Sequence, residues 1–223
     1  MRAVAWQSEV GDTANAEYKS VGEDADGKYV EVRATGDWRN VYFANSPITT
    51  EDMKKYDWVK ITFKGYYESS AGVMDTTKNF RISIGNKKDT GDIPANNQLR
   101  TFILNRADYA DFDAAVTDAA GGSKMLRILF RHWGAGANLI QVVRFYDIEF
   151  GYNDIKTDGS AINLTDKFGA ETEITATFTP TGGTETEISD VTAFVATESG
   201  TLKVTVKKFG YKAVTYTIQV IKE

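Results

Sequence analysis

The residues best suited to chemistry lie in the run Lys124 to Trp133, KMLRILFRHW. Two sets of side chains alternate along it: Leu126, Ile128 and Phe130 on one side, and Arg127, Leu129, Arg131 and Trp133 on the other. Alternation with a period of two places the sets on opposite faces of a β-strand. Two guanidinium groups and an indole on one open face suit a planar, hydroxyl-rich ligand, because rings stack on indole and Arg forks reach hydroxyls or carboxylates. The alternative is a solvated strand with one surface tryptophan.

Other strands must hold this one in place. The Gly-rich segment 134–138 predicts a turn into a second strand, Leu139 to Phe150. Earlier strands are predicted at residues 4–7, 28–33, 38–43, 57–67, 80–84 and 99–104. Short helices are expected only within 47–52 and 105–120. Many short strands with regular turns and few helices are typical of a jelly-roll β-sandwich, and we expect this fold over residues 1–152.

The composition changes after Tyr152. Residues 153–160 are polar and rich in turn formers, which predicts a domain edge. The chain beyond is rich in threonine, with short alternating segments at 172–178, 185–188, 193–196, 200–206 and 214–221. We therefore expect a second, smaller all-β domain over residues 153–223.

Composition limits the function classes. The chain has 223 residues, a net charge of −5, no cysteine, and 12% aromatic residues. Its 26 Lys and Arg residues are scattered and give no basic footprint for nucleic acid. Without cysteine there is neither a disulfide framework nor a thiolate metal site. No apolar run approaches the length of a membrane span.

Two stretches of the first domain resemble a known family. The run Gly27 to Phe43, GKYVEVRATGDWRNVYF, resembles the early strand pair of β-sandwich carbohydrate-binding modules of the xylan- and glucan-binding families, in which a Gly-Lys-Tyr strand precedes a Trp. The runs ILFRHW and VVRFYDIEF resemble the end of those modules, where the last strand carries an aromatic-X-Asp-hydrophobic pattern. The resemblance implies non-catalytic binding of a plant cell-wall or microbial polysaccharide. It also implies a monomeric module of a larger, secreted or bacterial cell-surface protein that degrades glycans.

The second domain resembles a different family. The run Ser199 to Val220, SGTLKVTVKKFGYKAVTYTIQV, is similar to the closing hairpin of bacterial Ig-like domains. Such domains are small β-sandwiches, and the resemblance implies a spacer.

The resemblance of the first domain also implies one structural calcium ion. The positions that match its ligands are Glu9, Asp24 or Asp26, and Asp147. Calcium takes six to eight oxygen ligands, which three carboxylates and backbone carbonyls can supply. The alternative is that these are solvated loop acids.

The predicted carbohydrate-binding residues are Trp38, Tyr42, Tyr67, Arg81, Arg127, Arg131, Trp133 and Arg144. The outward sets are cationic, and they also include Lys60, Lys64 and Tyr146. Because Arg pairs with carboxylates in a bidentate manner, we expect a preference for uronate-bearing glycans such as decorated xylan or pectin. The sequence does not assign these residues to one sheet or the other.

Two alternatives remain open. The segment Phe145 to Phe150 is similar to the catalytic strand of laminarinase-like glycoside hydrolases, but phenylalanine stands at the nucleophile position. Asp147 and Glu149 remain, about 7 Å apart on one strand face. His132 falls on the core side and no Gly-X-Ser-X-Gly elbow occurs, so we do not expect an enzyme. The other alternative is a structural or adhesive surface protein, although its repeating units would normally resemble each other more than these two do.

Overall fold

The computed structural model describes residues 7–9, 16–35, 39–44, 53–85, 88–117, 124–132, 139–169, 173–207 and 213–223. Side chains are described within residues 21–33, 53–85, 88–117, 139–169, 173–207 and 213–223. The chain divides into two compact units. The jelly-roll unit comprises Arg2–Lys54 and Val59–Phe150, and the C-terminal unit comprises Lys55–Trp58 and Gly151–Glu223. The division lies close to the domain edge expected after Tyr152, but the inclusion of Lys55–Trp58 in the C-terminal unit was not expected.

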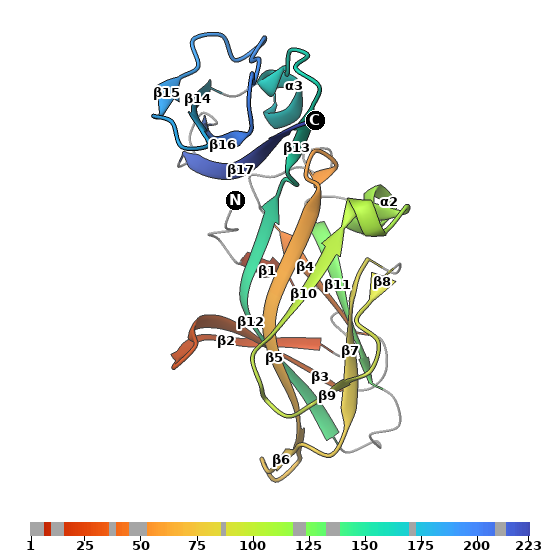
Figure 1. The fold of residues 1–223 in the computed structure, drawn as a ribbon. Helices are drawn as coiled ribbons and strands as arrows, with labels where there is room; N and C mark the ends of the chain where they lie inside the picture. The colour runs from red at the N-terminus through yellow and green to blue at the C-terminus, as the bar shows by residue number, and fades with distance from the viewer. Residues whose placement is uncertain are drawn as a thin grey trace. The chain divides into compact units, whose positions relative to one another are not determined.

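Two antiparallel sheets build the jelly-roll unit (Figure 1). Sheet A has the order β10 (Arg100–Asn105), β5 (Trp58–Ser69), β12 (Leu139–Gly151), β3 (Gly27–Thr35), β2 (Ala16–Asp24), with β6 (Met74–Asp75) beside β5. Sheet B has the order β1 (Gln7–Glu9), β4 (Arg39–Ala44), β11 (Lys124–His132), β7 (Asn79–Ile84), β8 (Lys88–Asp89), with β9 (Ile93–Pro94) beside β7.

The order of these strands is that of a jelly roll. In chain order β3, β4, β5, β7, β10, β11 and β12 alternate between sheet A and sheet B. The late strands β11 and β12 each insert between earlier ones, β11 between β4 and β7 and β12 between β3 and β5. This interleaving of early and late strands is the double Greek key of a jelly-roll sandwich. The predicted all-β sandwich is confirmed.

Alternation along the strands fills the core between the sheets. Val59, Ile61 and Phe63 are at most 1% exposed, while the residues between them are half-buried. On β7, Phe80 and Ile82 are equally buried, and the ring of Phe80 meets that of Phe63 edge-on at 6.1 Å. The strands predicted at 57–67 and 80–84 are confirmed, and their alternation places these residues in the core. The predicted core positions on β11 lie outside the described side chains.

Ser83 departs from the alternation of β7. It is on the same side of the strand as Arg81, but it is only 6% exposed. The hairpin into β8 covers it, and its hydroxyl donates to the carbonyls of Gly85 at 2.9 Å and Lys88 at 3.1 Å. Two short helices, η1 (Arg106–Asp108) and α2 (Phe112–Val116), lie in the predicted helical region. The helical turn predicted at 47–52 lies outside the described residues.

The C-terminal unit contains a five-stranded sheet, sheet C. Its order is β13 (Ile155–Thr157), β17 (Val214–Lys222), β16 (Gly200–Lys207), β14 (Glu173–Pro180), β15 (Thr186–Glu187), with β13 parallel to β17. Strict alternation along β16 buries Leu202, Val204 and Val206 on one face.

Helix α3 (Leu164–Phe168) belongs to the layer over that buried face, and the sequence did not predict it. Asn163 caps the helix by accepting from the backbone N–H groups of Thr165 at 3.0 Å and Asp166 at 3.3 Å. The strand predicted at 193–196 is reduced to an isolated bridge between Ile162 and Phe194. Among the described residues, this second layer is therefore made of α3, the bridge and loops rather than a second extended sheet.

An aromatic cluster packs Tyr56, from the segment Lys55–Trp58, against the rest of the C-terminal unit. Tyr152 contacts Phe168 at 4.5 Å, Tyr216 at 5.0 Å and Tyr56 at 5.2 Å between ring centroids. The four side chains are at most 9% exposed. Tyr56 therefore forms part of the core of this unit. No helix within the described part of the chain is long and apolar enough to cross a membrane.

Candidate functional site

The structure separates the predicted binding residues between two sheets. Arg81 lies between the buried residues Phe80 and Ile82, so it belongs to the outer face of sheet B. Antiparallel pairing places position 131 directly opposite Arg81, and position 127 opposite position 42. These four positions share the outer face of sheet B. Arg144 lies on β12 in sheet A.

Three aromatic candidates have other outcomes. Trp38 and Trp133 lie outside the described residues, so their role stays a prediction. Tyr67 is fully buried and donates its hydroxyl hydrogen to the carbonyl of Asn79 at 3.1 Å. A ring inside the sandwich cannot stack on a ligand, so the placement of Tyr67 among surface residues was wrong. Tyr67 is in phase with Val59, Ile61 and Phe63 along β5, so the alternation itself places it in the core, and Tyr66 is the residue that departs from the alternation.

The best-described cluster of polar side chains lies on the outer face of sheet A, the side away from Val59, Ile61 and Phe63. Seven charged groups form a continuous chain of contacts, which we call the charged ladder: Glu68, Arg33, Glu31, Arg144, Asp24, Lys64 and Asp26. It joins β2, β3, β5 and β12. Successive groups of the charged ladder have opposite charges, so each side chain is held in place by its neighbours in the ladder.

Glu31 is the central carboxylate of the charged ladder. One of its oxygens accepts from Nε of Arg33 at 3.0 Å and the other accepts from Nε of Arg144 at 2.9 Å. Register explains this contact, since Glu31 of β3 is directly opposite Arg144 of β12. Arg33 continues the ladder to Glu68 at 3.0 Å.

Tyrosines flank Arg144. Its guanidinium lies 4.5 Å from the ring centroid of Tyr29 and 5.9 Å from that of Tyr66. Burial opposes the charge of Arg144, but the hydrogen bond to Glu31 and nearby negative groups outweigh it, so the pKa of Arg144 is raised. Tyr29 also packs against Tyr146 with ring centroids 5.7 Å apart.

The other end of the charged ladder is organised around Lys64. Its ammonium forms ion pairs with Asp26 and with Asp24, the latter at 3.4 Å. Tyr146 donates its hydroxyl hydrogen to Asp24 at 2.7 Å, and this bond is the main cause of the lowered pKa of Asp24. Burial, with a contribution from the same bond, raises the pKa of Tyr146 to about 12. At neutral pH Asp24 is therefore ionised and Tyr146 is protonated.

The predicted calcium site fits this arrangement poorly. Asp24 and Asp26 both contact Lys64, and a divalent cation there would have to displace that ammonium. Glu9 of β1 is opposite Tyr42 in sheet B, whereas Asp24 is in sheet A. Among the described residues no three acidic or histidine side chains converge as a metal site would require. The side chain of Glu9 lies outside the description, so the calcium prediction as a whole stays untested.

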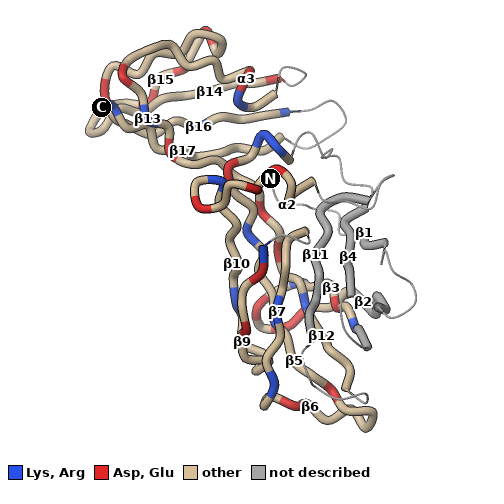
Figure 2. Tube along the Cα trace, turned by 90° about the vertical axis from the view of Figure 1, so that its right-hand side faces the viewer, with Lys and Arg blue, Asp and Glu red and all other residues tan. Residues whose placement is uncertain are grey.

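Several cations of the outer faces lie beside carboxylates. The charged ladder has four carboxylates and three cations. Lys60 pairs with Glu149, and Arg81 pairs with Asp92 at 2.6 Å and Asp89 at 3.6 Å. Acidic and basic residues are accordingly interspersed along the trace of this unit (Figure 2). The expected excess of free positive charge is not seen at these cations.

The remaining carboxylates of β12 are Asp147 and Glu149. Glu149 forms an ion pair with Lys60. The alternation of β12 shifts between Phe145 and Ile148, which are both buried although three positions apart. Beyond this shift Ile148 is buried between the half-buried Asp147 and Glu149, so the two acids keep the same strand face.

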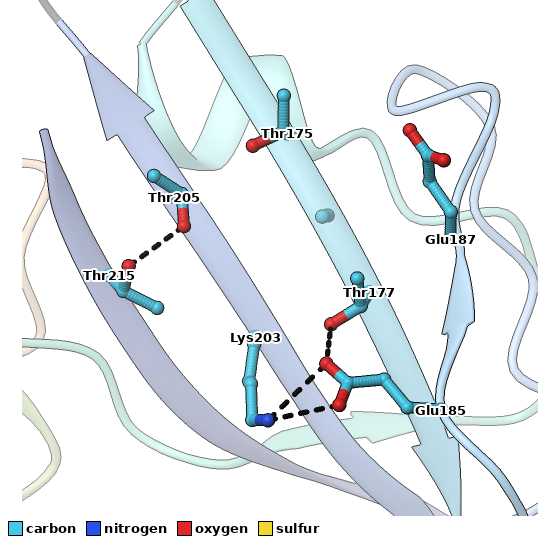
Figure 3. Close-up of a pocket in the computed structure, with 8 residues that line it drawn as sticks. Thr175, Thr177, Glu185, Glu187, Lys203, Thr205 and Thr215 are labelled. Atoms are coloured by element: carbon cyan, nitrogen blue, oxygen red, sulfur yellow. Dashed lines mark hydrogen bonds and ion pairs between the residues drawn. The ribbon is translucent and has the colours of Figure 1, made fainter.

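The C-terminal unit offers a shallow groove of about 470 Å³ on the open face of sheet C (Figure 3). Four of its eight lining residues are threonines, and Thr205 and Thr215 share a hydrogen bond of 2.8 Å. Glu185 accepts from Thr177 at 2.5 Å and from Lys203 at 3.2 Å. Among the described residues that line this groove none is aromatic, so these residues offer no stacking surface for sugar rings.

The predicted binding set lacked three residues of the outer face of sheet A: Tyr29, Glu31 and Tyr146. Tyr29 and Glu31 belong to the run Lys28 to Arg33, whose alternation with Val30 and Val32 was visible in the sequence, and Tyr146 was predicted only to face outward. The sequence did not show that β3 pairs with β12, and this pairing is what places Glu31 opposite Arg144.

Comparisons with known proteins add no family. No family model and no curated protein matches the chain. A β-1,2-glucanase from Parabacteroides distasonis aligns over all of this chain and 38% of its own, with 10% identity and a TM-score of 0.35. The M60 catalytic domain of Clostridium perfringens ZmpB with its CBM51-1 and CBM51-2 domains aligns over 97% of this chain and 22% of its own, with 12% identity and a TM-score of 0.33. This chain thus spans well under half of either structure, and likeness at these TM-scores assigns neither fold nor function.

Proposed function

We propose that the jelly-roll unit binds a polysaccharide without catalysing a reaction on it, and that the C-terminal unit serves as a spacer. The observation that carries this proposal is the group formed by Tyr29, Arg144 and Tyr146 on the outer face of sheet A. Two half-buried rings and a stacked guanidinium lie together on an open sheet, and ion pairs hold the polar groups in place. Sugars bind such surfaces by stacking on rings and exchanging hydrogen bonds with fixed polar groups.

Rigidity of the charged ladder favours binding. Ordering flexible side chains on association costs about 0.5–1.5 kcal/mol each, and side chains already fixed by ion pairs avoid much of that cost. The ladder also presents donors and acceptors side by side, as a hydroxyl-rich ligand requires. The sequence resemblance to xylan- and glucan-binding modules agrees with this reading. We extend the proposal to a plant cell-wall polysaccharide and to a larger secreted or cell-surface glycan-degrading protein.

The uronate preference is proposed for a different face. Arg33, Lys64 and Arg144 on the outer face of sheet A are each paired with carboxylates, so neither guanidinium of the charged ladder is free for a sugar acid. Positions 127 and 131, by contrast, lie on the outer face of sheet B with Arg81. A uronate-binding site, and any stacking by Trp38 or Trp133, belongs to that part of the proposal.

One observation favours the alternative of a structural or adhesive protein. The charged ladder satisfies its own members, which is also what a stable, non-binding sheet surface would show. The two readings differ in what removal of a tyrosine does. In the binding module Tyr29 matters for ligand retention, and in the structural protein it matters only for packing.

Affinity electrophoresis of the intact chain tests the proposal. Gels contain glucuronoxylan, a pectic polysaccharide, mixed-linkage glucan or no glycan. We expect retardation in at least one glycan gel, lost in Tyr29→Ala and Tyr146→Ala and kept in Tyr109→Ala, which removes a half-buried tyrosine of the same unit outside sheet A. Retardation that survives both sheet A variants but is lost in Trp133→Ala moves the site to sheet B. No retardation in any gel contradicts the function.

A further inference from the structure

Glu31 is placed to control which sugars the outer face of sheet A accepts. Its side chain is 8% exposed, while those of its partners Arg33 and Arg144 are 25% and 22% exposed. The carboxylate is therefore beneath the two guanidinium groups, which reach the surface. Both carboxylate oxygens are used, one for each arginine.

These contacts occupy the arginines. A guanidinium binds a ligand carboxylate best when it can offer two parallel N–H groups. Arg144 gives its Nε to Glu31 and brings Nη1 to 3.5 Å from Asp24, and Arg33 gives Nε to Glu31 and both Nη atoms to Glu68. A ligand carboxylate near Arg144 would also meet the negative charges of Glu31 and Asp24.

We propose that Glu31 is a specificity-determining residue: by holding Arg33 and Arg144 in ion pairs, it withholds both guanidinium groups from carboxylate-bearing sugars and makes this face selective for neutral glycan chains. This inference rests on the proposed function and names its ligand class. The tyrosines and the hydroxyl-compatible polar groups remain available to neutral sugars. Uronate-bearing chains are turned away by the excess of carboxylates.

The test is the substitution Glu31→Gln, which keeps the shape of the side chain and removes its charge. Retardation is compared in gels of polygalacturonate and of mixed-linkage glucan. We expect a gain in affinity for polygalacturonate of about tenfold or more over the unsubstituted chain, the scale of one charge-assisted pair. The gain should fall as salt is raised and should disappear in the double variant Glu31→Gln/Arg144→Ala.

Two further variants keep the outcome interpretable. Glu149→Gln removes a carboxylate of the same sheet that pairs with Lys60 outside the charged ladder, and it should leave the ratio of the two retardations unchanged. Glu68→Gln removes a partner of Arg33 alone and should give a smaller gain in affinity for polygalacturonate. This variant replaces Glu31→Gln in the test if Glu31→Gln does not fold. A folded Glu31→Gln with unchanged polygalacturonate retardation, or no gain in Glu68→Gln where Glu31→Gln is unfolded, overturns the inference.

Failure of the inference and failure of the proposed function have different signatures. If the unsubstituted chain is retarded by neutral glucan and Glu31→Gln behaves identically in both gels, binding stands and the role of Glu31 is wrong. If the unsubstituted chain is retarded by no glycan, the proposed function fails. If Glu31→Gln is then retarded by polygalacturonate, the result still supports the inference that Glu31 keeps Arg33 and Arg144 from binding carboxylates.

Discussion

Tyr146 of β12 donates its hydroxyl hydrogen to Asp24 of β2 at 2.7 Å. Asp24 also accepts from Lys64 of β5 at 3.4 Å, so one carboxylate ties three strands of sheet A together. Strand β3 lies between β2 and β12 in the sheet, so the hydrogen bond from Tyr146 to Asp24 crosses over β3. The outer face of sheet A is therefore a connected polar surface.

The substitution Tyr146→Phe should make stability less dependent on acid pH. The hydrogen bond from Tyr146 lowers the pKa of Asp24 below the ordinary 3.8, so its contribution to stability is present above that pH and is lost as pH falls through the lowered value. At neutral pH the variant should be less stable by about 1 kcal/mol. Urea unfolding from neutral pH down to about pH 3 should show this difference narrowing; a constant difference would contradict the linkage.

Calcium chelation should leave the thermal midpoint of the intact chain unchanged. The acids Asp24 and Asp26 are engaged by Lys64, and a calcium ion would have to compete with that ammonium. Thermal unfolding is followed with excess calcium and with excess chelator. A midpoint raised by calcium and lost in Asp147→Asn would restore the calcium site predicted from the sequence.

Phe168→Ala should destabilise the C-terminal unit by about 3 kcal/mol, because it removes a 5% exposed ring from the aromatic cluster. Phe168 lies 4.5 Å from the ring of Tyr152 and 5.8 Å from that of Tyr216. Chemical denaturation reports the change, with Ile221→Ala as control since Ile221 is 39% exposed. Equal effects of the two substitutions would show that the cluster does not form the core of this unit.

Gly65→Ala should destabilise the jelly-roll unit by about 2 kcal/mol through overpacking. A Cβ at Gly65 would overlap the ring of Phe80, which is 1% exposed and packed against Phe63. Thr62→Ala, on the half-buried side of the same strand, is the comparison and should cost less. Similar unfolding midpoints for both variants would mean that the sheets are packed less tightly than the structure has them.

The sequence predicted most of the fold because alternation reports burial directly. Val59, Ile61 and Phe63 repeat at period two, and each lies in the core. Helix α3 was missed, since a five-residue helix has too few turns to show a period of its own. Its cap, Asn163 followed by Thr165, was the available signal. The strand predicted at 193–196 did not form as a ladder: Phe194 and Ala196 are buried alternately, as they would be in a strand, but the backbone pairing is the single bridge from Phe194 to Ile162.

The site was less predictable than the fold because it depends on which strands are neighbours. Arg81 and Arg144 look equivalent in the sequence, yet one lies in sheet B and the other in sheet A. Sequence parity gives the face of a strand but not its sheet. Pairing of cations with carboxylates is equally hidden, since Glu31 and Arg144 are 113 positions apart. The uronate preference was inferred from the cations alone and missed these partners.

The measurement that tests the central claim most directly is isothermal titration of the intact chain with soluble mixed-linkage glucan and with glucuronoxylan, for the unsubstituted protein, Tyr29→Ala and Tyr109→Ala. The account predicts saturable binding of at least one glycan that Tyr29→Ala weakens about tenfold, the scale expected for loss of a stacking ring, while Tyr109→Ala binds normally. Binding that is equal in all three proteins would show that the outer face of sheet A is not the site, and the absence of binding to either glycan would contradict a polysaccharide-binding function.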